Sequence, residues 1–125
     1  MRYAQTDYDA AKNMSILHNP IPLEIVCYHC QQSAEKILKA YLLAMEEPLI
    51  KTHDILILLK RCIEYDNEFN IFVDICPSLT TYAIYARYPI GEDALNENDM
   101  HGALKNSLFV LEFTKNKIYS LDIKE

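Results

Sequence analysis

Glycine is scarce in this chain: two glycines occur among 125 residues, and neither follows an asparagine or aspartate between alternating apolar runs. Tight β-hairpin turns favour residues that tolerate positive φ, and Asn-Gly or Asp-Gly pairs are their strongest sequence signal. The sequence therefore predicts few hairpins and favours helices.

Long apolar runs and an excess of positive charge are also missing. No apolar run approaches the ~20 residues that a membrane helix needs, and the start of the chain lacks the hydrophobic stretch of a signal peptide. We therefore expect a cytoplasmic protein with no membrane association. The formal net charge of -6 argues against a broadly basic nucleic-acid coat, although a local patch of lysine and arginine could still bind phosphate.

The residues that are present can build a substantial core. Hydrophobic residues make up 50% of the chain and charged residues 24%, which is typical of a folded protein rather than a disordered one. A chain of this length is too short for two well-packed cores. We predict one domain that spans residues 1–125.

Apolar residues recur at helical spacing in four long segments and one shorter, less regular segment. The most regular stripe has steps of three and four residues and consists of Cys27, Cys30, Ala34, Ile37, Leu38, Tyr41 and Met45. The predicted helices cover about 3–17, 22–45, 52–63 and 98–119, with short helical pieces in 69–86. These features predict an all-α fold, an up-and-down bundle of four main helices plus a short extra helix.

Two finer predictions concern the first and third helices. In the first, we expect Tyr3, Ala10, Met14 and Leu17 to face the core and Asp7 to face water. In the third, Thr52 is the expected N-cap, with Asp54 in the first turn, where a negative charge suits the helix dipole.

The Cys27-Tyr28-His29-Cys30 segment has the spacing of a zinc or redox motif. A four-ligand site needs a second matching pair, yet Cys62 and Cys76 stand alone in the sequence. Cys27 and Cys30 also lie on the apolar stripe, where a free cysteine behaves as a small hydrophobe. We favour a packing role over metal or redox chemistry and predict no metal site and no cofactor.

The opposite side of the same helix carries a predicted polar face of His29, Gln32, Lys36 and, at its margin, Lys39. The border residues Gln31 and Glu35 could hydrogen-bond to a neighbouring helix. This face is either a solvated surface or a site for an anionic or nucleotide ligand.

Two further clusters hold candidate ligand-binding residues. Arg87-Tyr88-Pro89 places an arginine, whose planar fork suits phosphate or carboxylate, at the end of a predicted helix. The same position would suit a capping arginine without any ligand. In Thr52-His53-Asp54, His53 is either a ligand contact or an exposed first-turn residue. Gly-rich phosphate loops, His-Glu-x-x-His helices and Gly-x-Ser-x-Gly elbows are absent from the sequence.

Four ordered segments of the chain together resemble the HEPN domain family. They are the N-terminal helix with Tyr3, Asp7 and Ala10-Ala11; the run from Cys27 to Ala40; Lys51-Thr52-His53-Asp54-Ile55; and Tyr82-Ala83-Ile84-Tyr85-Ala86-Arg87-Tyr88-Pro89. The resemblance covers nearly the whole chain. It implies a helical bundle that is often dimeric, is related to the substrate-binding region of nucleotidyltransferases, and is often encoded beside a minimal nucleotidyltransferase.

Many HEPN proteins are metal-independent RNases that use an arginine followed four to six residues later by a histidine. Here Arg87 is followed by His101, fourteen residues on, and Arg61 has Tyr65 nearby but no histidine. The usual proton carrier for attack by the RNA 2′-hydroxyl is therefore missing. We predict no catalytic residues.

These observations lead to one main hypothesis and two alternatives. The main hypothesis is a non-catalytic HEPN subunit that forms a homodimer and binds a nucleotide, RNA or a nucleotidyltransferase partner. With that partner it could form a toxin-antitoxin type pair. Its expected contacts are His29, Gln32, Lys36, His53, Arg87 and Tyr88. One alternative is an atypical dimeric ribonuclease in which Arg87 meets His53 or His101. The other is a purely structural dimeric interaction module.

Overall fold

The computed structural model describes residues 1–79 and 95–123. Its helices are α1 (Arg2–Leu17), α2 (Leu23–Ala44), α3 (Ile55–Tyr65) and α5 (Glu97–Ile123), with a 3-10 helix η1 (Asn67–Phe72) after α3. No strand occurs among the described residues. The all-α prediction is confirmed, and the bounds of the four long predicted helices hold to within a few residues. Of the short helical pieces predicted in 69–86, the part from residue 80 onward lies outside the described residues.

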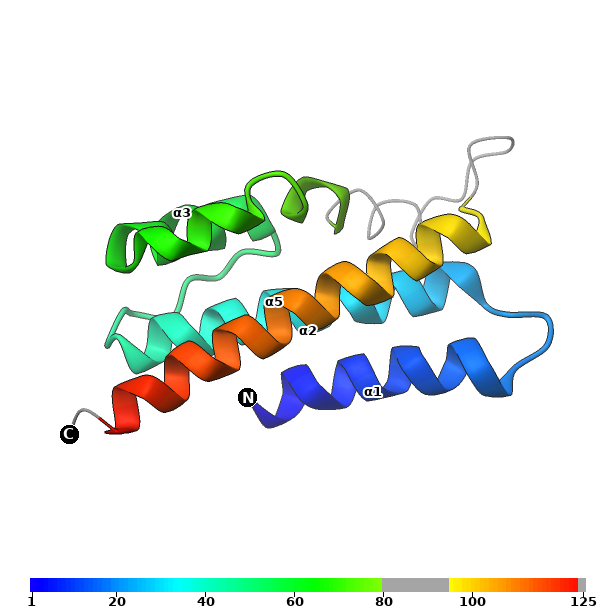
Figure 1. Ribbon diagram of the computed structural model, residues 1–125, viewed down its shortest axis with the longest axis horizontal. Coiled ribbons are helices and arrows are strands. Elements are labelled where there is room, and N and C mark those ends of the chain that lie inside the picture. The colour runs from blue at the N-terminus through cyan, green and yellow to red at the C-terminus, as the bar shows by residue number, and fades with distance from the viewer. Residues whose placement is uncertain (80–94, 124–125) are drawn as a thin grey trace.

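Helix α2 lies at the centre of the bundle. It contacts α1, α3 and α5, while α5 also contacts α1, and η1 packs against α3. Figure 1 shows α1 antiparallel to α2, with α5 crossing α2 over much of its length. Because α2 has neighbours on several sides, residues outside its predicted apolar stripe are buried too, including Val26, Ser33 and Leu42. None of the described helices is both long and apolar enough to span a membrane.

The end of α2 is closed by backbone hydrogen bonds around a residue with positive φ. Glu46 has φ 66°, and the amides of Glu46 and Glu47 donate to the carbonyls of Leu43 and Leu42, each at 2.9 Å. This pair of bonds is the Schellman arrangement, in which glycine is the usual residue at the left-handed position. The turn leads the chain away from α2 and holds Glu47 close to the helix end.

The start of α3 differs from the prediction by two residues. Asp54, not Thr52, is the N-cap, and its side chain accepts a hydrogen bond from the Leu56 amide at 2.9 Å. The Thr52 hydroxyl instead accepts from the Asp54 amide at 3.1 Å. Both side chains therefore satisfy backbone donors, and the carboxylate satisfies one of the free amides in the first turn of the helix.

The predicted core face of α1 is wrong in part: Met14 packs against the core as expected, but Tyr3 and Leu17 do not lie in it and Asp7 is not exposed to water. The buried residues are Ala4, Asp7, Tyr8 and Ala11, whereas Tyr3 is 65% exposed and Leu17 also faces solvent. The small alanine side chains let α1 approach α2 closely, and a buried carboxylate is tolerated because it has cationic partners.

Aromatic side chains fill the core between η1, α2 and α5. The Phe69 ring lies 4.7 Å from that of Tyr41 and 5.3 Å from that of Phe113, measured between ring centroids. Phe72 lies 5.0 Å from Phe113 and 5.1 Å from Phe109. Most of these pairs meet edge to face, the favoured arrangement for aromatic rings.

Candidate functional site

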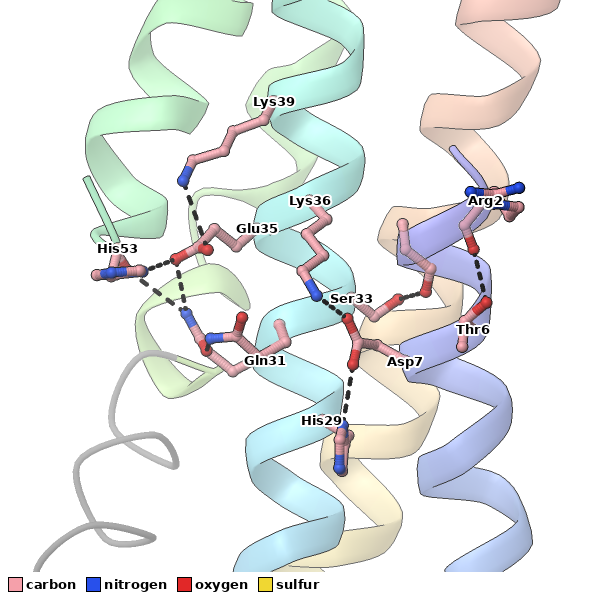
Figure 2. A network of polar contacts seen from close by, with 12 residues as sticks. Arg2, Thr6, Asp7, His29, Gln31, Ser33, Glu35, Lys36, Lys39 and His53 are labelled. Carbon is pink, nitrogen blue, oxygen red and sulfur yellow. Dashed lines mark hydrogen bonds and ion pairs between the residues drawn. The ribbon is translucent and has the colours of Figure 1, made fainter. Parts of the chain in front are cut away.

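A carboxylate from α1 organises one half of the polar face of α2. Asp7 is 8% exposed; its Oδ1 lies 2.9 Å from Nδ1 of His29, and its Oδ2 lies 2.5 Å from Nζ of Lys36. His29 and Lys36 are seven residues apart, so they lie on the same side of the helix. Figure 2 shows the Asp7 side chain placed between them.

The Asp7 contact determines how the His29 ring presents itself. An ionised carboxylate can only accept hydrogen bonds, so Nδ1 of His29 carries the proton that it shares with Asp7. Nε2 is then left for another partner. A nearby hydrogen bond from the Ser33 hydroxyl to the Ala4 carbonyl, at 2.8 Å, also ties α2 to α1.

A second buried carboxylate, Glu35, organises the other half of the face. Glu35 is 2% exposed; its Oε1 lies 3.0 Å from Nδ1 of His53, and its Oε2 lies 3.6 Å from Nζ of Lys39. Gln31 donates to Glu35 and to the His53 backbone carbonyl, both at 3.4 Å. Gln31 and Glu35 were expected to hydrogen-bond to a neighbouring helix, and their partner is instead His53 in the segment before α3.

The two halves repeat one arrangement on one side of the bundle. Asp7 and Glu35 are each buried and each pair with one histidine and one lysine. His53 comes from the segment before α3, and its side chain is 72% exposed. Figure 2 shows the Asp7 set between α2 and α1, and the Glu35 set between α2 and the segment that carries His53.

The candidate residues predicted from sequence are partly brought together by this arrangement. His29, Lys36 and His53 belong to the two carboxylate sets, and Gln32 donates to the Gln31 side-chain oxygen at 2.8 Å. Arg87 and Tyr88 lie outside the described residues. Asp7 was missed as a site residue, although its spacing from Ala4 and Ala11 places it on the close-packed face of α1.

Arg61 is occupied by acidic partners of its own. It forms ion pairs with Glu47 and, at 3.0 Å, with Glu64, while the Tyr65 hydroxyl donates to Glu47 at 2.6 Å. The hydrogen bond from Tyr65, together with Arg61, lowers the pKa of the Glu47 carboxyl. The same contact with Glu47 raises the pKa of Tyr65, so its phenol stays protonated at neutral pH.

All four cysteines are free and buried. Burial raises the pKa of Cys27 to about 12 and that of Cys30 to about 11. Thiols that stay protonated are poor nucleophiles and poor metal ligands. Within residues 1–79 and 95–123, no group of three or more His, Cys, Asp or Glu side chains is placed to hold a metal ion.

Comparison with known proteins identifies the family. The family model for the HEPN domain matches residues 1–118. The chain belongs to the HEPN domain family. No curated protein and no solved structure matches this HEPN chain. The family match agrees with the resemblance seen in the sequence, and the fold has the helical bundle that this resemblance implied.

Proposed function

We propose that this HEPN protein is a non-catalytic binding subunit that holds a nucleotide and works with a nucleotidyltransferase partner, as in a toxin-antitoxin type pair. The observation that carries the proposal is the pair of buried carboxylates, Asp7 and Glu35, each orienting one histidine and one lysine on one side of α2. The histidine and lysine N–H groups of these two sets can donate hydrogen bonds to a ligand, and neither set contains a nucleophilic side chain such as serine or cysteine.

Donor chemistry favours an anionic ligand at this face. Lysine ammonium groups have three donors each, and Lys36 uses one of them on Asp7. Phosphate oxygens accept strong charge-assisted hydrogen bonds from such groups. The net charge of -6 means that this attraction is local rather than a property of the whole surface.

We propose a non-catalytic role because no arginine of the chain has a histidine at the spacing used by HEPN RNases. None of Arg2, Arg61 and Arg87 is followed by a histidine at the spacing associated with HEPN RNases. Arg61 is also committed to two glutamates. A ribonuclease needs a general acid or base close to the reacting oxygen, so we expect binding without turnover.

Calorimetric titration with nucleoside triphosphates tests the ligand. We expect heat of binding for the wild-type protein and weaker binding for Arg87→Ala. Arg61→Ala is the matched control, because it removes an arginine that acidic side chains already hold. Absence of heat with every nucleotide contradicts the ligand part of the proposal.

Two further measurements test the subunit role. A tagged chain should co-purify with a nucleotidyltransferase encoded beside it, and light scattering should give the mass of a homodimer. Incubation with a mixed RNA pool should leave the RNA intact. Cleavage that is lost in His53→Ala or His101→Ala would instead support the dimeric ribonuclease.

A further inference from the structure

A pocket of about 230 Å³ lies between the start of α1 and the second half of α2. Its apolar part is formed by Ala4 of α1 together with Ala40 and Leu43 of α2. The small alanines leave the space, and the exposed Leu43 side chain bounds it on the α2 side. The surface of the pocket is therefore mostly apolar and suits a flat hydrophobic group.

Two lysines of α2 also line this pocket. Lys36 and Lys39 both contribute to it, and the carboxylates that they pair with lie buried beneath them, with side-chain exposures of 12% for Asp7 and 3% for Glu35. Lys39 lies 3.6 Å from Glu35, which is an ion pair rather than a full hydrogen bond. The ammonium of Lys39 therefore keeps donors for an incoming anion, while Glu35 retains Gln31 and His53 as further partners.

An aromatic ring lies at the α1 side of the same pocket. Tyr3 is 65% exposed, and the Arg2 guanidinium lies 5.0 Å from its ring centroid and donates to its hydroxyl at 3.2 Å. These contacts hold the ring in position and add a positive charge nearby. Exposed aromatic rings of this kind serve as stacking platforms for nucleobases.

We propose that this pocket binds a single nucleotide unit, with its phosphate on Lys36 and Lys39 and its base against Tyr3. The inference rests on the proposed function for the class of ligand and adds the place and the contacts. Ligand pockets commonly measure roughly 300–1,000 Å³, so this smaller space takes one unit and not a dinucleotide. The unit belongs either to a free mononucleotide or to an RNA strand.

Calorimetric titration with adenosine monophosphate, adenosine and a short oligoadenylate tests the pocket and its ligand. We expect adenosine to bind more weakly than the monophosphate because it lacks the phosphate. Binding of the oligoadenylate but not of the monophosphate would assign the pocket to RNA. Equal affinity for adenosine and the monophosphate would overturn the role of the lysines.

Substitutions on the two sides of the pocket identify the contacts. Lys39→Gln and Tyr3→Ala should each weaken binding roughly tenfold, the loss expected for one charged hydrogen bond or one stacked base. Tyr3→Phe, which keeps the ring, should bind more tightly than Tyr3→Ala. Lys60→Gln on the exposed surface of α3 is the matched lysine control and should bind like the wild type. Circular dichroism spectra verify that each variant is folded.

The outcomes separate this inference from the proposed function. If Lys39→Gln and Tyr3→Ala bind like the wild type while Arg87→Ala binds weakly, the pocket assignment is wrong and the nucleotide proposal stands. If the wild-type protein binds none of the ligands, both fail.

Discussion

The two sides of α2 are held by different kinds of contact. Toward α1, the interface consists of small side chains such as Ala4 and Ala11 and of polar bonds from Asp7 and Ser33. Toward η1 and α5, it includes tilted and edge-to-face aromatic rings centred on Phe69.

The difference between the two interfaces suggests a division of roles, in which the aromatic side of α2 stabilises the fold and the polar side carries the candidate binding site. Burial of large rings removes much apolar surface from water and adds favourable ring contacts. Alanines bury little surface but allow helices to approach closely, so that polar groups on α1 and α2 can reach one another. The candidate site lies along the polar interface, where partners can be exchanged for a ligand without disturbing the aromatic core.

The largest predicted effect is on the aromatic side. Phe69→Ala should lower the free energy of unfolding by about 3–5 kcal/mol, because the ring is fully buried and its removal leaves a cavity. Urea denaturation measures the loss. Phe109→Ala is the matched control, since this ring is 49% exposed and should matter much less. Equal losses for the two variants would contradict the assignment of stability to the buried rings.

Removal of Asp7 should have the next largest effect. Asp7→Ala leaves His29 and Lys36 without their shared partner, and we expect a loss of about 1–3 kcal/mol in the free energy of unfolding. Both cationic groups are partly exposed and regain water, which keeps the loss below that of Phe69→Ala. Asp7→Asn, which keeps an acceptor oxygen, should lose less. Hydrogen exchange should show the largest change in α1, and a uniform change over all helices would argue against a local tether.

The sequence predicts the fold well because α2 and the helix ends carry strong local information. The three- and four-residue steps from Cys27 to Met45 identify the buried stripe. Its residues up to Tyr41 are buried, and Met45 is partly buried. Polar and proline-containing segments mark the breaks. The face of α1 is harder to predict, because Tyr3 has much more apolar surface to bury than Ala4, yet Ala4 is the residue that is buried.

The site is less predictable because it depends on how helices cross. The sequence places His29 and Lys36 on one polar face of α2, which is confirmed. It does not show that Asp7, twenty-two residues before His29, would lie between them. That contact follows from the antiparallel packing of α1 on α2, a tertiary property. His53 similarly reaches Glu35 only through the path of the α2–α3 connection.

Alkaline pH tests whether the apolar side of α2, which carries the buried Cys27, excludes water. Burial raises the pKa of Cys27 from 9.0 to about 12, so as the pH rises the unfolded chain loses this proton first. The associated stability is complete below pH 9.0 and is lost as the pH rises toward about 12. One unit above 9.0, the loss is on the order of 1 kcal/mol.

Comparison with Cys27→Ala isolates this thiol from the other titrating groups. Urea denaturation of both proteins at neutral and alkaline pH should show a smaller fall in stability for the variant. The same fall in both proteins would mean that Cys27 is hydrated in the folded protein and that other titrating groups cause the loss.

The smallest predicted effect on stability belongs to His53, and it gives the sharpest separation of the two roles. His53→Ala should change the free energy of unfolding by no more than about 0.5 kcal/mol, because the side chain is 72% exposed and Glu35 keeps Lys39 and Gln31 as partners. Nucleotide affinity should nevertheless fall, since the variant loses one of the oriented histidines of the proposed site. Glu35→Ala provides the contrast: it removes a buried carboxylate with three partners and should lower both stability and affinity. If His53→Ala destabilises the protein as much as Glu35→Ala does, then His53 is a structural residue of the α2–α3 connection and not a ligand contact.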